Sequence, residues 1–474
     1  MDRGNGCHAG PRTIHLSKED IMVRRMGDYF SRWAEKYMPD PFLFAILLTF
    51  LTLVLGIIFT DNGPFEMLKH WNTGFWALLT FSMQMCLILV TGYALATTRV
   101  VRRGIAALAD IPKTGPGAAG LVALTAIIAG YINWGLGLIV GALMARQVGL
   151  RGYEKQVPMH YPLLGAAGYA GLAVWHGGFS GSAPLLVATK GHFLEAQIGI
   201  IPVSDTLFSP LNLVVAACLI IGLPFLFKLL NPADAENMVT IDKVLPNVDE
   251  LINEIEDKDD PESRRDTVAS KLENSVAISL LIGIMGLVIV VWYFVTKGFK
   301  LNLNIVNFTF LFVGILLHKT PINYVRAISD GTKGCSGIIL QFPFYSGIMG
   351  MMKFSGLILV IAGWFVAISN QYTYPLLTFV SGALVNIFVP SGGGQWAVQG
   401  PIVVEAAKAL NVTYPKAIMA LSYGDQWTNL FQPFWALALL GLTGLKARQI
   451  MGYCMAVMLI GAIFFFLALL VLPA

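Results

Sequence analysis

The chain has 474 residues, of which 56% are hydrophobic and only 13% are charged, against roughly 25% charged residues in a typical soluble domain. This composition excludes an ordinary soluble protein and predicts an integral membrane protein whose main surroundings are the lipid bilayer. The net charge of +4 comes without a basic cluster interleaved with aromatic residues, so no nucleic acid partner is expected. The five cysteines lack the spacing of a zinc site or a disulfide framework.

The N-terminal segment is polar and basic and has no short apolar core before a cleavage site. We therefore expect no cleavable signal peptide. Residues 1–41 are predicted to form a cytoplasmic tail, and residues 1–21 a disordered or non-native extension with Met22 as an alternative start.

Seven uninterrupted apolar runs follow along the chain. A helix of roughly 20 residues crosses the hydrocarbon core of a bilayer. The runs lie at residues 42–60, 75–97, 207–230, 275–296, 304–318, 335–352 and 449–472. Each is predicted to be a simple transmembrane helix.

Four further apolar segments are interrupted by Asn, Gly, Pro or polar clusters. The interruptions are "NWG" in 117–147, "WHGGFSGSAP" in 161–188, "PSGGGQW" in 374–410 and "GDQWTNLFQP" in 414–445. We predict that 117–147 and 374–410 are re-entrant helical hairpins, and that 161–188 and 414–445 are transmembrane helices unwound in the middle. Because irregular backbone at membrane depth is tolerated only where protein or a water-filled cavity satisfies it, the four breaks are expected to converge on one site.

The interrupted segments repeat. Asn133 matches Asn386, and Tyr161-Pro162 matches Tyr414-Pro415, at one constant offset along the chain. The predicted domains are a first repeat at 42–230, a cytoplasmic linker at 231–274, an extra transmembrane helix at 275–297 and a second repeat at 304–472. An odd number of predicted crossings separates the two starts, so the repeat is expected to be inverted. The alternative is a chance likeness between two Gly-rich membrane regions.

The positions of Lys and Arg predict the orientation. Short cytoplasmic loops collect basic residues, and most of the 32 Lys and Arg fall on one side when the N-terminus is placed inside. We therefore predict a multi-pass protein of the cytoplasmic membrane of a bacterium, with the N-terminus in the cytoplasm and the C-terminus outside.

The breaks contain neutral polar side chains, glycine carbonyls and helix ends, but no Lys or Arg. Half-helix N-termini attract an anionic group, whereas unwound carbonyls and hydroxyls coordinate a small cation. A dicarboxylate or phosphate carrier would more often place an Arg or Lys there. We therefore expect a monovalent organic anion as substrate, Na⁺ or H⁺ as the coupling ion and no other cofactor.

All four breaks supply candidate site residues. The candidate substrate-binding residues are Asn133, Trp134, Gly135, His176, Ser180, Ser182, Asn386, Ser391, Gly392, Gly393, Gly394, Gln395, Thr428, Asn429 and Gln432. The candidate Na⁺ ligands are Asn133, Ser180, Asn386, Asp425 and Asn429. Four indole rings, those of Trp134, Trp175, Trp396 and Trp427, are expected to wall a pocket for an apolar tail.

Each of these residues also has a structural interpretation. The two asparagines either bind ligands or cap broken helices. Asp425, a carboxylate within an apolar crossing, is predicted to ligate Na⁺ or carry the coupling proton, or else to cap a half-helix. His176 is expected either to titrate near neutral pH or to make structural hydrogen bonds. Three consecutive glycines, Gly392 to Gly394, indicate a place where backbone approaches a ligand.

The segments "YINWGLGLIVGALMAR", "HYPLLGAAGYAGLAVWHGGFSGSAPL", "VNIFVPSGGGQWAVQGPIV" and "YGDQWTNLFQPFWALALLG" resemble the short-chain fatty acid transporter family of the acetoacetate-operon type, over residues 26–472. That family belongs with an ion-transporter group that includes dicarboxylate/sodium symporters. The resemblance implies an all-α fold with inverted repeats, two re-entrant hairpins, two unwound helices, a homodimer and an elevator motion. Of the Ser-Asn-Thr hairpin-tip motif of the dicarboxylate relatives, only Asn133 and Asn386 are present.

Together these features predict secondary active transport of monocarboxylates such as acetoacetate or butyrate, and not an enzyme. The "GGFSGS" stretch does not make a serine-hydrolase elbow, because the pattern fails at Ser182 and no strand precedes it. The alternatives are a Na⁺-coupled dicarboxylate or amino-acid-conjugate symporter of the same fold and, from another class, a channel or membrane sensor.

Overall fold

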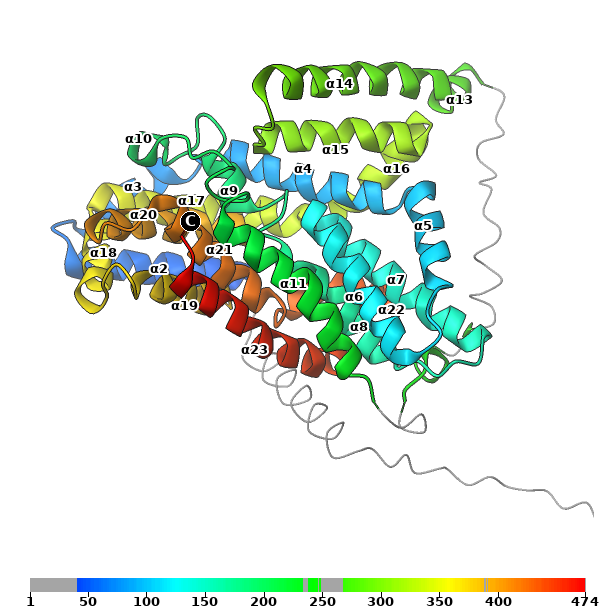
Figure 1. The fold of residues 1–474 in the computed structure, drawn as a ribbon. Coiled ribbons are helices and arrows are strands. Elements are labelled where there is room, and N and C mark those ends of the chain that lie inside the picture. Colours follow the sequence, from blue (N-terminus) through cyan, green and yellow to red (C-terminus); the bar gives the residue numbers. More distant parts are fainter. Residues whose placement is uncertain are drawn as a thin grey trace, which may run out of the picture.

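The computed structural model describes residues 41–232, 238–245, 247–248, 267–387, 389 and 391–473. Every regular element in this part of the chain is an α-helix or a 3-10 helix, which confirms the all-α prediction. Nearly all of the predicted N-terminal tail and most of the predicted linker at 231–274 lie outside the described residues. Figure 1 shows the helices as a bundle with many of their axes running in similar directions.

The helices of the first half follow one another with short connections. They are α2 (Pro41–Phe59), α3 (Pro64–Gly74), α4 (Leu79–Ala96), α5 (Arg99–Ala109), α6 (Gly115–Ile132), α7 (Trp134–Glu154), α8 (Tyr161–Tyr169), the 3-10 helix η1 (Ala170–Val174), α9 (Ser182–Val187), α10 (Glu195–Ile198) and α11 (Pro210–Leu229).

The second half begins after the 3-10 helix η3 (Ile241–Lys243). It contains α13 (Val268–Glu273), α14 (Val276–Lys297), α15 (Leu303–His318), α16 (Pro321–Thr332), η5 (Lys333–Cys335), α17 (Ser336–Ser355), α18 (Leu357–Ile368), α19 (Tyr374–Asn386), α20 (Gly392–Ala409), α21 (Tyr414–Asn429), α22 (Pro433–Thr443) and α23 (Ala447–Val471).

Seven helical segments of the described part are long and apolar enough to cross a membrane, so the chain is a multi-pass membrane protein. Six of the seven uninterrupted runs predicted from the sequence overlap these segments. The run at 304–318 forms α15, which has only 16 residues. Conversely, α6 was predicted as one arm of a hairpin, yet with 18 residues it is long enough to cross alone. The re-entrant course of the hairpins stays a prediction.

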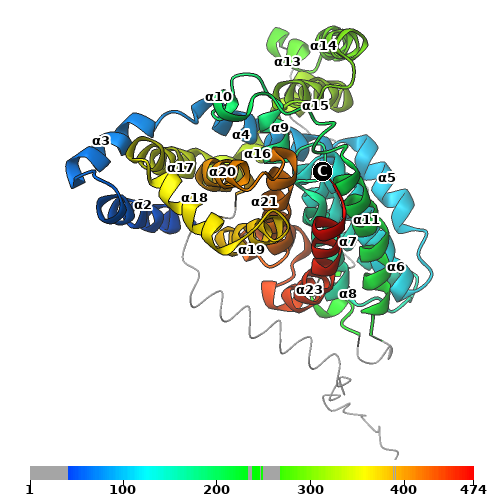
Figure 2. The same cartoon turned by 60° about the vertical axis from the view of Figure 1, so that its left-hand side comes forward.

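The helices α4 and α17 both pack on helices from the opposite half of the chain, and α4 also packs on α7 of its own half. Helix α17 lies against α2 and α3, and α4 lies against α15 and α16. Helix α14 packs on α15 at the edge of the bundle (Figures 1 and 2). It exposes large apolar side chains such as Leu281 and Val295, and a broad exposed apolar surface of this kind faces lipid in a membrane protein.

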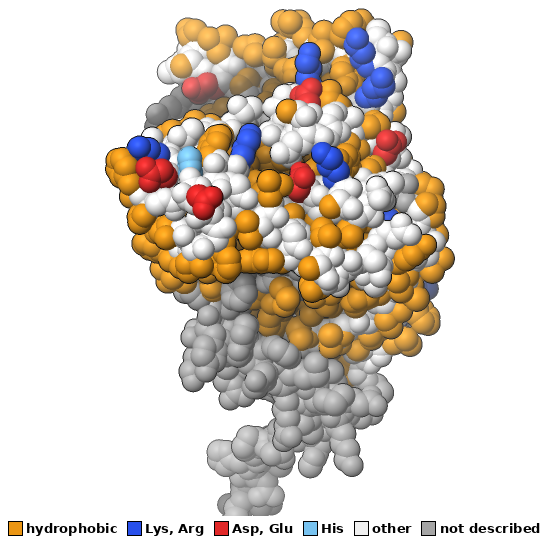
Figure 3. All heavy atoms as spheres, turned by 90° about the vertical axis from the view of Figure 1, so that its left-hand side faces the viewer, with side chains coloured by type: hydrophobic (Ala, Val, Ile, Leu, Met, Phe, Trp, Pro, Cys, Tyr) orange, Lys and Arg blue, Asp and Glu red, His pale blue; other side chains and the backbone are white. Residues whose placement is uncertain are grey.

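A second group of helices surrounds the interrupted segments. Helix α6 packs on α7, α8, η1 and α11, and α21 packs on α19, α20 and α23. At the end of the bundle where α3, α10 and α18 lie, charged side chains are spread in a band across the face, and apolar side chains dominate below that band (Figure 3).

Helices α7 and α8 cross with their backbones in contact. A Cβ added at Gly141 of α7 would lie 2.0 Å from the carbonyl oxygen of Gly168, and one added at Gly168 of α8 would lie 2.4 Å from the carbonyl oxygen of Gly141. Glycine is therefore required at both positions, and this crossing fixes the start of the second interrupted segment against the first.

Candidate functional site

The first interruption is one residue long. Asn133 alone separates α6 from α7 and has an extended backbone (φ −156°, ψ 128°). Its Oδ1 accepts the N–H of Leu136 at 2.9 Å, and its Nδ2 donates to the carbonyl of Ile88 in α4 at 3.2 Å. The predicted capping role of Asn133 is therefore confirmed, whereas its role as a substrate or Na⁺ ligand stays a prediction.

The second interruption lies between η1 and α9 and packs on the first. The N–H of Trp134 donates to Ser180 Oγ at 2.9 Å, and the N–H of Phe179 donates to the carbonyl of Tyr131 at 2.7 Å. A Cβ at Gly178 would meet that same carbonyl oxygen at 2.4 Å. The two predicted breaks of the first half are therefore joined directly.

His176 and Asp425, predicted from different halves of the chain, are in contact. His176 Nε2 lies 2.7 Å from Asp425 Oδ1, with the two side chains only 1% and 2% exposed. His176 Nδ1 accepts the backbone N–H of Ser182 at 3.4 Å, which leaves Nε2 as the ring nitrogen that donates to the carboxylate. Asn429 Nδ2 donates to the same Oδ1 at 3.0 Å, and Oδ2 has no partner.

Asn386 ends α19 and ties it to the end of α21. Its Nδ2 lies within hydrogen-bonding distance of three acceptors: the carbonyl of Asp425 (2.8 Å), Asn429 Oδ1 (2.9 Å) and Thr428 Oγ1 (3.0 Å). Gln432 Nε2 donates to the carbonyl of Asn386 at 2.7 Å. The Oδ1 atom of Asn386 is buried without a partner. Asn386 of the third break and the predicted residues of the fourth break thus form one hydrogen-bonded cluster.

The fourth interruption contains fewer residues than the sequence suggests. The stretch from Asp425 to Asn429 was predicted to be unwound, but it forms the last turns of α21, and the break is confined to residues 430–432. Thr428 Oγ1 hydrogen-bonds back to the carbonyl of Gly424 at 3.2 Å, so polar side chains here satisfy one another without unwinding the helix. Pro433, the first residue of α22, sets the break, because the residue before a proline avoids the helical conformation.

The three glycines lie in the first turn of α20, which Ser391 caps by accepting the N–H of Gly394 at 3.2 Å. A Cβ at Gly392 would lie 2.0 Å from His176 Cε1, and one at Gly393 would lie 2.9 Å from Phe81 Cζ. In this structure, protein side chains fill the space that the glycines leave. Backbone contact with a ligand at these glycines stays a prediction.

We predict that Gly392→Ala will destabilise the protein by about 1–3 kcal/mol, because the added methyl group overlaps the His176 ring in a packed interior. The measurement is thermal unfolding of the purified protein in detergent. Gly441→Ala is the control, since nothing lies within 4 Å of a Cβ at this helical position. Equal melting temperatures for the two variants would show that His176 moves aside freely.

Gln395 is anchored near the glycines. Its Nε2 donates to the carbonyl of Gly382 and to Gln399 Oε1, each at 2.7 Å, and its Oε1 is buried without a partner. Gln395 therefore couples α19 and α20 and presents an unused acceptor.

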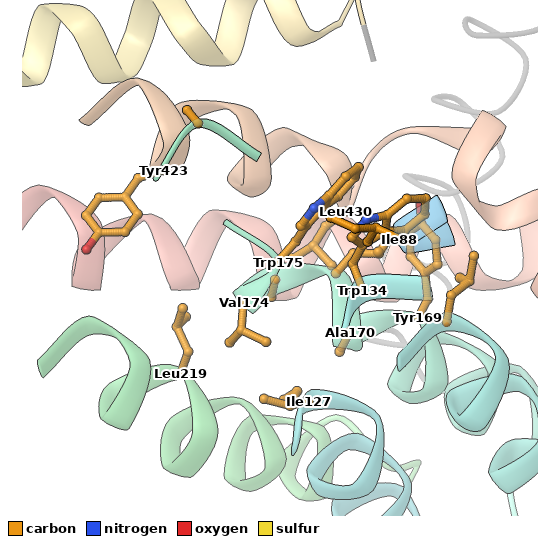
Figure 4. Packing of buried hydrophobic residues seen from close by; sticks show 14 of the residues in the cluster. Ile88, Ile127, Trp134, Tyr169, Ala170, Val174, Trp175, Leu219, Tyr423 and Leu430 are labelled. Carbon is orange, nitrogen blue, oxygen red and sulfur yellow. The ribbon is translucent and has the colours of Figure 1, made fainter. Parts of the chain in front are cut away.

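A cluster of indole rings lies next to His176. Trp134 and Trp175 stack with ring centroids 4.4 Å apart (Figure 4), and Trp435 lies edge-on to both at 5.2 Å. The structure thus brings together two of the four predicted tryptophans. Trp427 stacks on Phe379 instead, with its ring centroid 5.2 Å from that of Phe379. The fourth, Trp396, packs against Gly400.

Sequence reasoning missed two polar residues that hold the second break in place. Gln426 Oε1 accepts the N–H groups of His176 (2.8 Å) and Gly177 (3.2 Å). Asn212 Nδ2 donates to the carbonyl of Gly177 at 2.8 Å, and its Oδ1 accepts the Tyr423 hydroxyl at 3.0 Å. The available signals were the position of Gln426 inside the "GDQW" motif and an amide within the apolar helix α11.

The site is closed to solvent and contains unused polar atoms. Of the predicted site residues, all except Ser391 are buried. Buried polar atoms normally have a partner, but several at this site have none: Ser182 Oγ, Asn386 Oδ1, Gln395 Oε1, Asp425 Oδ2 and the indole N–H groups of Trp134 and Trp175. In the described part of the chain, no three His, Cys, Asp or Glu residues are grouped to hold a metal.

Interrupted membrane helices that meet around a buried polar cluster are typical of membrane transporters. The fold agrees: the chain superimposes on the YdaH transporter of Alcanivorax borkumensis with a TM-score of 0.56 at 15% identity, over 92% of this chain and 99% of that one. MtrF of Neisseria gonorrhoeae, described as illuminating a class of antimetabolite efflux pumps, gives a TM-score of 0.52 at 15% identity, over 94% and 96% of the two chains. At this identity the likeness concerns the fold alone.

The family is shown by sequence. The family model named "Short chain fatty acid transporter" matches residues 22–472. A relative from Escherichia coli (strain K12) is 44% identical over 449 residues, which is 94% of this chain and 99% of the relative. One from Haemophilus influenzae is 42% identical over 455 residues, again 94% and 99%. Both are provisionally named short-chain fatty acid transporters. The chain belongs to the short-chain fatty acid transporter family.

Proposed function

We propose that this protein is a secondary active carrier of short-chain monocarboxylates such as acetoacetate or butyrate. It would couple their movement across a bacterial cytoplasmic membrane to Na⁺ or H⁺. The observation that carries the proposal is the buried contact between His176 and Asp425, placed where the interrupted helices of both halves meet.

The charge of this contact favours a coupling cation. The Asp425 carboxylate is buried and receives two hydrogen bonds, from His176 and Asn429. No Lys or Arg of the described chain pairs with it. Burying an ionised carboxylate without a counter-charge is costly. A proton on Asp425 Oδ2, or a Na⁺ ion shared by Asp425 Oδ2 and Asn386 Oδ1, would remove that cost.

The donors of the site suit one carboxylate. The indole N–H groups of Trp134 and Trp175 have no partner, and α7 and α20 both begin at the site with the positive ends of their dipoles. Donors without a full positive charge match a monocarboxylate better than a dicarboxylate, which would call for an Arg or Lys. The stacked indole faces would contact a short acyl tail.

We further propose that the two halves form an inverted repeat that moves as an elevator. The helix order supports this: α2, α4, α5, α6–α7, α8–α9 and α11 correspond in sequence to α15, α17, α18, α19–α20, α21–α22 and α23. Under this proposal, α2–α4 and α15–α17 form the static scaffold of a homodimer. The hairpins and broken helices then carry the substrate, with the N-terminus inside and the C-terminus outside.

The test is uptake of labelled butyrate into proteoliposomes that hold the purified full-length protein, under an imposed Na⁺ gradient or pH gradient. We expect saturable accumulation with one of the two gradients, no accumulation after an ionophore collapses it, and no competition by a tenfold excess of succinate. Competition by succinate would favour the dicarboxylate alternative. Flux that only equilibrates butyrate, whatever the gradient, would favour a channel.

A further inference from the structure

A hollow of about 440 Å³ lies where α4 and α5 meet α14, α15 and α16, outside the interrupted segments. Its polar lining includes Arg99, Arg102, His318, Lys319, Thr320 and Asp330. Figure 1 shows α5, α13 and α16 toward the same end of the bundle.

The hollow carries an excess of positive charge. Among the described residues, no carboxylate pairs with Arg99, Arg102 or Lys319. Asp330, the one acidic residue of the lining, is engaged by Lys333 at 2.7 Å. Like charges gathered in a concave surface repel one another and focus a field that attracts an anion.

The start of α16 adds donors to the same place. Thr320 precedes this 12-residue helix but its side chain makes no capping hydrogen bond, and its Oγ1 is buried without a partner. The hydroxyl is free to donate, and the N–H groups of the first helical turn and the helix dipole favour a negative group there. This unsatisfied hydroxyl is independent of the charge excess and points to the same class of ligand.

We propose that this hollow binds a phosphate-bearing anion, namely the headgroup of an anionic phospholipid such as phosphatidylglycerol. Guanidinium groups bind phosphate with paired hydrogen bonds. The hollow is also bordered by Val276, at the start of α14, and Leu317. Val276 is 45% exposed and lies at one end of the apolar outer surface of α14. The acyl chains of the lipid would lie along this surface. Basic pockets between membrane helices bind anionic headgroups in this way.

The bound headgroup would join two parts of the fold. Arg99 and Arg102 belong to α5, which connects α4 to α6 and packs on α7, whereas Lys319 and Thr320 connect α15 to α16. The anion would therefore tie the α5 connector to the α15–α16 corner, and its loss would loosen this contact. This inference does not depend on which substrate the protein carries.

The experiment is native mass spectrometry of the full-length protein with phosphatidylglycerol or phosphatidylcholine, at matched lipid concentrations. The test variant carries Arg99→Gln, Arg102→Gln and Lys319→Gln. The control variant carries Arg103→Gln, Lys113→Gln and Arg448→Gln, which remove the same charge from exposed positions outside the hollow. We expect phosphatidylglycerol to bind the wild type and the control alike, and its apparent affinity to fall about tenfold or more in the test variant.

The melting temperature in detergent, with phosphatidylglycerol or inorganic phosphate added, separates the sources of the anion. Stabilisation of wild type but not of the test variant by inorganic phosphate, with phosphatidylglycerol no better than phosphatidylcholine, would support the phosphate site but assign it a soluble ligand. The single variant Arg102→Gln covers the case in which the triple variant does not fold. Equal phosphatidylglycerol affinity in wild type, the single or triple test variant and the control would overturn the proposal.

Discussion

Asp425→Asn is expected to abolish gradient-driven accumulation of butyrate while the protein remains folded. Asparagine has the shape of aspartate and its Oδ1 still accepts the proton of His176 Nε2, which now lies 2.7 Å from Asp425 Oδ1. The buried negative charge, however, is gone. Loss of a charged partner corresponds to about 3 kcal/mol, or roughly 100-fold weaker cation binding.

The measurement is uptake into proteoliposomes under the gradient that drives the wild type, with thermal unfolding to establish folding. Asp205→Asn is the matched control, because Asp205 lies exposed in the connection before α11. Undiminished accumulation by Asp425→Asn would remove Asp425 from the coupling mechanism. Loss of accumulation together with loss of folding in Asp425→Asn would instead assign the carboxylate a structural role.

The second large effect is expected at the crossing of α7 and α8. Gly141→Ala places a methyl group 2.0 Å from the carbonyl oxygen of Gly168, and a backbone atom cannot turn aside as a flexible side chain does. The two helices must separate, at a cost of about 3 kcal/mol or more. We expect a melting temperature several degrees lower and a large loss of folded protein.

Gly104→Ala is the control for this substitution. Gly104 also lies inside a helix, α5, but nothing lies within 4 Å of its added Cβ. Alanine is favoured over glycine in a helix by about 1 kcal/mol, so this variant should melt at or slightly above the wild-type temperature. If Gly141→Ala has the same melting temperature as Gly104→Ala, the close approach of α7 and α8 does not matter for stability.

The sequence was sufficient to predict the class of fold, because a long apolar run in a bilayer satisfies its backbone hydrogen bonds by forming a helix. It also identified residues that the structure brings together. Asn133, placed between two apolar arms, had to satisfy a broken helix, and it does so as a cap. His176 and Asp425 stood out as ionisable groups in apolar surroundings, and such groups seek a partner.

The remaining features could not be predicted because they depend on which face of a helix meets which neighbour. Helix α21 is buried on most sides, so the sequence does not indicate that Trp427 turns toward Phe379 while Trp435, in the next helix, joins the indole cluster. The length of the fourth break could likewise not be predicted from the sequence. Polar residues near a proline are typical both of an unwound segment and of a helix end whose side chains bond to one another.

The pairing of α4 with α15 and α16, and of α17 with α2 and α3, has a consequence for biogenesis. When α4 leaves the ribosome and enters the membrane, about 200 residues of chain must still be translated before α15 and α16 exist, as the ranges of α4 and α15 show. Until then α4 can pack on α7 of its own half, but its surface that meets α15 and α16 has only lipid or an insertion factor to contact, since long-range contacts must wait for the later segment. Truncation before α15 should therefore leave an N-terminal fragment that quality-control proteases degrade rapidly.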